Sequence, residues 1–172
     1  MEFNEVSFNI DDRSDKSNNI SFLKGISLAS KNCNSLNVSS NKNFNIKTNK
    51  LSPKVIEILK IKADCYLLQD IRLSSSVNQE IFKKELECHK YGSYDSYINS
   101  NKSNRGTAIL VRRNLNYKVI REFSSNCNNI CIIDCIINNF RLSIISTYAP
   151  IQTGNLNFFP NLKKKNSRNW KH

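Results

Sequence analysis

The order of hydrophobic and polar residues predicts short strands with two helices, and its clearest unit is a helix, a buried strand and a polar loop in succession. A helical pattern covers residues 53–61, with Ser52 as the N-cap and Pro53 at the first helical position. Residues 65–68 are apolar and bounded by polar residues, which favours a strand buried on both faces. The loop that follows opens with Asp70.

The rest of the chain reads mainly as strands. Alternation and helical spacing predict a strand at residues 26–30, a helix at 78–89, an extended segment with Tyr91, Tyr94 and Tyr97, and strands at 106–111, 117–123, 130–137 and 140–147. The last two form a hairpin turned by Asn138 and Asn139, because asparagine tolerates the left-handed backbone of such turns. Pro150 cannot donate to a ladder, so the final strand stops before it, with Tyr148 at its end.

Asp70 is the first candidate for chemistry. A carboxylate at the carboxyl end of a buried strand is well placed to hold a metal ion, because the strand fixes the backbone while the loop opens to solvent. The alternative is an aspartate that caps its own loop and has no chemical role. The residue pattern alone leaves both interpretations open.

Other residues of chemical interest favour a structural role. The six cysteines include no C-x-x-C pair, which indicates reduced thiols. Cys127, Cys131 and Cys135 fall on one face of a strand pattern and are expected to be small buried side chains in preference to metal ligands. His89 is expected on a helix surface or in packing. The tyrosines at 91–97 are expected to pack within a strand, with base stacking as the alternative.

Length and composition indicate one domain. The chain has 172 residues, of which 39% are hydrophobic, enough for a single core. Residues 1–24 are expected to form a polar N-terminal extension, either a mobile arm or a loosely docked segment. Residues 25–150 are expected to form the domain, and residues 151–172 a basic tail. Residues 41–50 predict a low-complexity surface insertion. No secretory segment or membrane-length apolar run occurs, so we expect an intracellular protein, nuclear or cytoplasmic, that is not secreted.

The charge of the chain favours a polyanionic partner. Its formal net charge is +12 and its pI is about 9.6. Nucleic acid is the first candidate partner, and an anionic membrane surface is the second.

Four short motifs occur in order along the chain. Residues 32–37 read NCNSLN, residues 68–73 read LQDIRL, residues 105–110 read RGTAIL and residues 147–150 read TYAP. Between residues 26 and 150, this order and spacing resemble the first half of the endonuclease/exonuclease/phosphatase superfamily, which has a DNase I-like fold. Within it, the chain is most similar to the endonuclease domains of LINE-type non-LTR retrotransposons.

The resemblance implies a partial four-layer α/β sandwich, of the α+β kind with mainly antiparallel or mixed sheets, and metal-dependent cleavage of phosphodiester bonds. By that similarity Asn32 would lie beside the metal and the scissile phosphate, Asp70 would hold Mg²⁺ or Mn²⁺, and Tyr148 would hydrogen-bond the phosphate. Hard divalent ions prefer carboxylate and amide oxygens, and Asn and Tyr supply neutral donors that orient a phosphate. The partner implied is nucleic acid, DNA in preference to RNA.

The chain departs from the family in two ways. Asp70 stands where the family usually has glutamate, so its shorter side chain would reach a metal through a shifted backbone or a water molecule. The later motifs, a Gly-Asp-x-Asn strand end, a further aspartate and a terminal Asp-His pair, do not occur, and His172 after Lys171 does not replace the pair. We therefore expect a truncated domain. Its isoleucine-rich hairpin would lack a covering sheet, which would favour self-association or a partner chain.

Three functional hypotheses follow. The first is a truncated nuclease-family domain from a mobile element or virus-like gene, with reduced or no catalysis. The second is a basic module that binds nucleic acid without cleaving it, and the third is a small α/β domain whose motif matches are coincidental. Cleavage that depends on Asp70 and on Mg²⁺ would identify the nuclease, whereas salt-sensitive binding without cleavage would identify the binding module.

Overall fold

The structure is a computed structural model that describes residues 4–5, 25–36, 52–73, 75–87, 90–100 and 105–148. Within these residues the chain forms two helices and two sheets. In chain order the elements are β1 (Asn4–Glu5), β2 (Leu28–Asn32), α2 (Pro53–Leu59), β3 (Cys65–Gln69), α3 (Ser76–Glu85), β4 (Tyr94–Asn99), β5 (Thr107–Arg112), β6 (Tyr117–Ser124), β7 (Ile130–Ile137) and β8 (Phe140–Thr147).

The larger sheet has five strands in the order β1-β2-β3-β5-β4. Only β2 and β3 are parallel, because α2 connects them as a crossover. All the other pairs are antiparallel. The predicted mixed sheet is therefore confirmed, and two residues of the predicted N-terminal extension form its edge strand β1.

The smaller sheet has three antiparallel strands in the order β6-β7-β8. β7 and β8 form the predicted hairpin with the predicted bounds, and Ile137 pairs with Phe140 next to the turn. Asn138 and Asn139 have φ angles of 48° and 73°, the left-handed conformation that such a turn requires.

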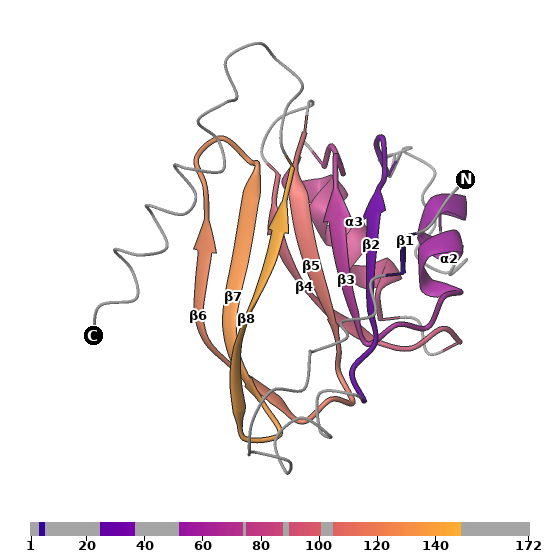
Figure 1. The fold of residues 1–172 in the computed structure, drawn as a ribbon. Helices are drawn as coiled ribbons and strands as arrows, with labels where there is room; N and C mark the ends of the chain where they lie inside the picture. Colours follow the sequence, from indigo (N-terminus) through magenta and orange to yellow (C-terminus); the bar gives the residue numbers. More distant parts are fainter. Residues whose placement is uncertain are drawn as a thin grey trace.

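The elements stack in three layers (Figure 1). α2 and α3 cover one face of the five-stranded sheet, and the three-stranded sheet covers the other. β3 lies in the middle and is covered on both faces, as its apolar run predicted. Tyr66 and Leu68 point into the helix-side core, whereas Cys65 and Leu67 contact the core between the sheets.

Each core is a continuous set of apolar side chains. The core beneath the helices contains Val55, Ile58, Leu59, Tyr66, Leu68, Phe82, Leu86, Tyr94, Ala108 and Leu110. The core between the sheets contains Cys65, Ile109, Val111, Cys131, Ile133, Cys135, Ile137 and Ile144. The chain thus builds both layers of a sandwich by itself.

This second core corrects one expectation. The sequence predicted that the inner face of the hairpin would lack a covering sheet. Instead, β7 and β8 fold back over β3, β4 and β5, and Ile133 and Ile137 are buried between the sheets. The hairpin therefore covers the sheet formed earlier in the chain, and its inner face supplies no apolar surface for self-association.

The helices keep their predicted caps. Ser52 caps α2 by accepting the backbone N–H of Val55 at 3.4 Å, with Pro53 at the first helical position. α3 begins two residues before its predicted start, because the hydroxyl of Ser75 accepts the N–H of Asn78 at 3.1 Å. It ends before the predicted boundary, and the carbonyl of Leu86 accepts a hydrogen bond from the N–H at the start of β4.

Cys127 differs from its prediction. It lies before β7 and is exposed, whereas Cys131 and Cys135 are buried as expected. His89, Pro150, the 41–50 insertion and the basic tail lie outside the described residues. In the part of the chain that the structure describes, no helix is long and apolar enough to cross a membrane.

Candidate functional site

Several strands end together at one edge of the sandwich, which we call the upper edge. It is defined by Asn32, Gln69, Asn99, Thr107 and Thr147. Asn32 pairs with Gln69 across β2 and β3, and Thr107 at the start of β5 pairs with both Gln69 and Asn99. The ends of β2, β3 and β8 point the same way in Figure 1, so the loops that follow them lie at this edge.

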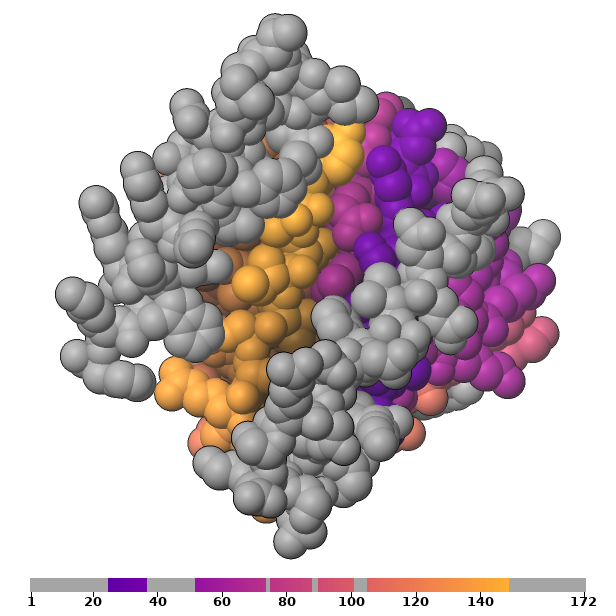
Figure 2. All heavy atoms as spheres, in the orientation of Figure 1, coloured from indigo at the N-terminus to yellow at the C-terminus, as the bar shows by residue number. Residues whose placement is uncertain are grey.

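The upper edge brings the three predicted site residues together. Asn32 is the last residue of β2, Asp70 directly follows β3, and Tyr148 directly follows β8. β8 is held against β3 by a buried hydrogen bond from the hydroxyl of Ser146 to the carbonyl of Leu68, at 3.1 Å. Figure 2 shows the end of β8, in yellow, beside the magenta and indigo strands. The structure thus places these residues at one edge of the sandwich.

The loop after β3 is fixed on both sides by backbone hydrogen bonds. The carbonyl of Asp70 accepts the N–H of Ser35 at 2.8 Å, and the N–H of Arg72 donates to the carbonyl of Arg105 at 2.9 Å. Ile71, between them, is completely buried. Such a loop has little freedom to change the positions of Asp70 and Arg72.

This loop holds two residues in the left-handed conformation. Asp70 has φ of 52° and Arg72 has φ of 54°. Further positive φ angles at this edge belong to Asn34, Ser35, Arg105 and Gly106. Left-handed backbone costs on the order of 1 kcal/mol or more at each residue other than glycine. Strain of this kind gathers at binding and catalytic sites, which supports a functional reading of the upper edge.

Asp70 and Arg72 form a two-point ion pair. The Nε of Arg72 donates to Oδ1 of Asp70 at 2.9 Å, and Nη2 donates to Oδ2 at 2.8 Å. Nη2 also donates to the side-chain oxygen of Asn34 at 3.1 Å. The side chain of Asp70 is only 7% exposed, whereas that of Arg72 is 41% exposed. The pair therefore presents a guanidinium to solvent above a buried carboxylate.

The electrostatics agree with this geometry. The hydrogen bonds and the negative charge of Asp70 raise the pKa of Arg72 above its ordinary value, with a smaller contribution from the Tyr148 hydroxyl. The Tyr148 side chain is therefore within electrostatic range of the guanidinium. No described residue accepts a hydrogen bond from Nη1 of Arg72, which carries two N–H donors.

The described residues of the upper edge do not by themselves fit a divalent metal ion. Both oxygens of Asp70 accept hydrogen bonds from Arg72, and the side-chain oxygen of Asn32 accepts the N–H of Asn34 at 3.2 Å. Among the described residues, no three His, Cys, Asp or Glu side chains are grouped so that they could hold a metal. A Mg²⁺ ion needs several oxygen ligands. Here the carboxylate of Asp70 is already paired with Arg72.

The balance of charge at the upper edge is positive. Asp70 is accompanied by the cationic side chains of Arg72 and Lys54, and the backbone of a third cationic residue, Arg105, lies at the same edge. Lys54 contacts the loop after β2, where its ammonium group donates to the carbonyl of Ser35 at 2.6 Å. An excess of positive charge favours an anionic ligand over a cationic one.

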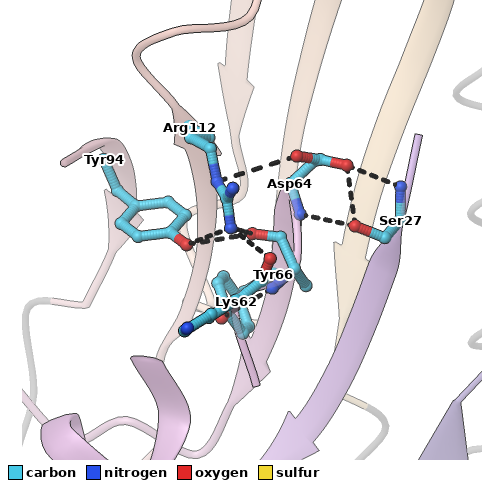
Figure 3. Close-up of polar contacts among 7 residues, drawn as sticks. Ser27, Lys62, Asp64, Tyr66, Tyr94 and Arg112 are labelled. Carbon is cyan, nitrogen blue, oxygen red and sulfur yellow. Dashed lines mark hydrogen bonds and ion pairs between the residues drawn. The ribbon is translucent and has the colours of Figure 1, made fainter. Parts of the chain in front are cut away.

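A second arginine cluster, at the opposite edge, has a structural role (Figure 3). Arg112 lies 3.7 Å from Asp64, donates to the carbonyl of Ala63 at 3.1 Å and donates to the hydroxyl of Tyr94 at 3.1 Å. Asp64 also accepts a hydrogen bond from the hydroxyl of Ser27, at 2.7 Å. These contacts tie the starts of β2 and β3 to the end of β5. Arg112 thus joins the ends of three strands, whereas Arg72 donates hydrogen bonds to Asp70 and Asn34 in the loops of the upper edge.

The sequence alone missed the two cations that organise the upper edge. Arg72 was part of the LQDIRL motif but had no assigned role, although a basic residue two positions after Asp70 was visible. Lys54 was simply a helix residue, because its contact with the loop after β2 joins segments about twenty residues apart. Tyr148 lies just after the last strand, as expected, whereas Asn32, which falls beyond the strand predicted at residues 26–30, is the last residue of β2.

No protein-family model matches the chain, and no curated protein matches its sequence. Solved structures do match its fold. A humanized D. rerio TDP2 with 14 mutations aligns over 83% of this chain and 54% of its own length, with a TM-score of 0.52 and 14% identity. An AP endonuclease from Archaeoglobus fulgidus aligns over 83% of this chain and 50% of its own, with a TM-score of 0.50 and 16% identity.

The chain therefore spans about half the length of the solved structures it matches. At these identities the similarity concerns the fold. The layer order, the mixed sheet and these neighbours agree with the architecture that the four sequence motifs implied. The chain has an α/β fold of the DNase I-like type, which it shares with these two solved structures.

Proposed function

We propose that the upper edge binds the phosphodiester backbone of nucleic acid, with Arg72 as the principal phosphate-binding side chain. The observation that carries this proposal is the two-point pairing of Arg72 with the buried Asp70, which orients the guanidinium and occupies Nε and Nη2 but, among the described residues, not Nη1. Planar guanidinium groups match the geometry of phosphate oxygens, and prior orientation reduces the entropy lost on binding.

Neutral donors near Arg72 complete the proposed phosphate site. The hydroxyl of Tyr148 is within electrostatic range of the guanidinium, and the amide of Asn32 keeps its NH₂ group as a donor while its oxygen is occupied. Arg105 and Lys54 add positive charge at the same edge. The net charge of +12 adds the sequence-independent attraction to polyanions that nucleic-acid-binding proteins use.

DNA is the nucleic acid that we propose in preference to RNA. One structural neighbour is an AP endonuclease by its name, and the sequence motifs resemble endonuclease domains of LINE-type retrotransposons. The name of that neighbour supports a DNA substrate, and the proposed origin in a mobile element rests on the motif resemblance alone. Because the chain spans about half of each neighbour, the activity of those proteins is not transferred to it.

The proposal is tested by measuring the affinity for a fluorescent DNA duplex in EDTA. Arg72→Gln should weaken binding about tenfold, because it removes a charge-assisted hydrogen bond. Arg113→Gln is the matched control: its side chain is 45% exposed and pairs with Asp95 at 2.8 Å, at the opposite edge. Equal losses in the two variants, or no loss in Arg72→Gln, would refute the proposal.

Metal-dependent cleavage is a second candidate function, favoured by the position of Asp70 directly after β3, where the family resemblance implies a ligand for Mg²⁺ or Mn²⁺. The described residues lack the further carboxylates that such an ion needs, so we propose cleavage only for a site that other residues complete. A nicking assay on supercoiled plasmid tests this function. Nicking that requires Mg²⁺ and is lost in Asp70→Ala would support it, whereas DNA binding without nicking would leave the binding function alone.

A further inference from the structure

Lys54 occupies a position in α2 that is unfavourable for a cation. It is the second helical residue, after the N-cap Ser52 and Pro53. The amino terminus of a helix carries a partial positive charge, so a lysine in the first turn is destabilising unless something else compensates. The first turn of α2 contains no acidic residue. A residue that breaks a local rule in this way commonly serves a tertiary contact.

The tertiary contact of Lys54 is a group of three backbone carbonyls. Its Nζ donates to the carbonyl of Cys33 at 3.1 Å, to that of Asn34 at 3.1 Å and to that of Ser35 at 2.6 Å. An ammonium group has three N–H donors, and here each one has its own acceptor. The side chain is partly buried, which strengthens these charge-assisted hydrogen bonds.

The three carbonyls converge because the loop is strained. Asn34 and Ser35 are consecutive left-handed residues, with φ angles of 43° and 70°. This conformation is rare for two successive residues other than glycine, and it turns neighbouring carbonyl dipoles toward one another. A cation among them offsets both the strain and the dipole repulsion. Lys54 therefore stabilises a loop shape that asparagine tolerates at position 34 but that is unfavourable for Ser35.

That loop contacts the proposed phosphate site directly. The side-chain oxygen of Asn34 accepts a hydrogen bond from Nη2 of Arg72 at 3.1 Å, and the N–H of Asn34 donates to the side-chain oxygen of Asn32. We propose that Lys54 is a positioning residue: it holds this loop so that Asn32 and Arg72 bind phosphate, without contacting the phosphate itself. This inference rests on the proposed function of the upper edge.

The test compares Lys54→Ala with Lys60→Ala, an exposed lysine just after the same helix. Lys54→Ala should weaken binding to a DNA duplex about three- to tenfold. The slope of log Kd against log salt concentration should stay unchanged, because a direct phosphate contact would lower that slope by about 0.9. Propylammonium ions should restore affinity to Lys54→Ala, whereas the same concentration of tetramethylammonium, which has no N–H group, should not.

The inference is overturned if Lys54→Ala binds DNA as Lys60→Ala does. It is also overturned if the salt slope falls by about 0.9, which would make Lys54 a phosphate contact, or if propylammonium and tetramethylammonium act alike. Should Lys54→Ala not fold, Lys54→Gln gives the same readouts with a neutral amide that donates to two of the carbonyls. Arg72→Gln is measured in parallel. If Arg72→Gln binds DNA normally, the proposed function is wrong. If Arg72→Gln weakens DNA binding and Lys54→Ala does not, only the proposed role of Lys54 is wrong.

Discussion

Arg72 and Asp70 face each other from two left-handed backbone positions on either side of the buried Ile71, with φ angles of 54° and 52°. The two side chains meet through hydrogen bonds of 2.9 and 2.8 Å. A carboxylate held in this way is a partner for a guanidinium, and it is not available to a metal ion unless Arg72 moves. This pairing is the basis on which we propose that the upper edge binds an anion.

Gly106 is expected to be the most sensitive glycine in the described part of the chain. Its φ is +113°, and an added Cβ would lie 2.8 Å from Cβ of Ser100 and 2.9 Å from Cγ1 of Ile71. Gly106→Ala should lower the free energy of unfolding by roughly 3 kcal/mol, through strain and overpacking. Gly92→Ala is the control, because its φ is +106° but its nearest contact is 3.3 Å, with Tyr94. A comparison by urea unfolding that gave equal losses would contradict the packing argument.

Glu85 should make stability depend on pH. Burial raises the pKa of its carboxyl above the ordinary value of about 4.3, against the opposing effect of the backbone N–H of Ser52, which donates to it at 2.9 Å. Between the ordinary and the raised pKa, the folded state binds more protons than the unfolded state. Stability from this group therefore falls as pH rises through that window and is constant above it.

Glu85→Gln should remove the dependence of stability on pH that Glu85 causes. At neutral pH the variant should be at least as stable as the natural protein, because a neutral amide still accepts a hydrogen bond from the N–H of Ser52 without burying a charge. Urea unfolding at several values between pH 4 and pH 7 measures the difference. Glu80→Gln, on the exposed side of the same helix, is the control. If Glu85→Gln followed the same pH profile as the natural protein, the burial argument would be wrong.

The thiols of the chain should differ sharply in reactivity. Burial raises the pKa of Cys33, Cys65 and Cys131 to about 12 and that of Cys135 to about 11. Because the thiolate is the reactive form, these four should stay unmodified in the folded protein. Cys127 is exposed and should react first among the five described cysteines. Mass-spectrometric mapping of iodoacetamide labelling measures this order, and early labelling of Cys65 or Cys135 would contradict the packing of the two sheets.

Local signals were sufficient to predict several elements. Ser52 and Pro53 marked the start of α2, and Asn138-Asn139 between two apolar runs fixed the register of the β7–β8 hairpin. The apolar run at the start of β3 correctly indicated burial on both faces. The start of α3 was harder to locate, because three consecutive serines offer alternative N-caps and the capping residue proved to be Ser75.

Contacts between segments that are far apart in the sequence were not predicted. Nothing in the hairpin's sequence states that its inner face folds back onto β3 and β5, so it was expected to be uncovered. The Asp70–Arg72 pair depends on left-handed backbone at two residues that carry no glycine or asparagine signal. The contact of Lys54 with the loop after β2 depends on the parallel pairing of β2 and β3. The strand ends predicted that Asp70 and Tyr148 would follow strands, but the sequence did not predict the contacts of Arg72 and Lys54.

The most direct test of phosphate binding by Arg72 is the salt dependence of DNA affinity in EDTA, measured for the natural protein, Arg72→Gln and Arg113→Gln. If Arg72 neutralises one phosphate, the slope of log Kd against log salt should fall by about 0.9 in Arg72→Gln and stay unchanged in Arg113→Gln. An unchanged slope in Arg72→Gln, or DNA binding that appears only when Mg²⁺ is present, would contradict the account.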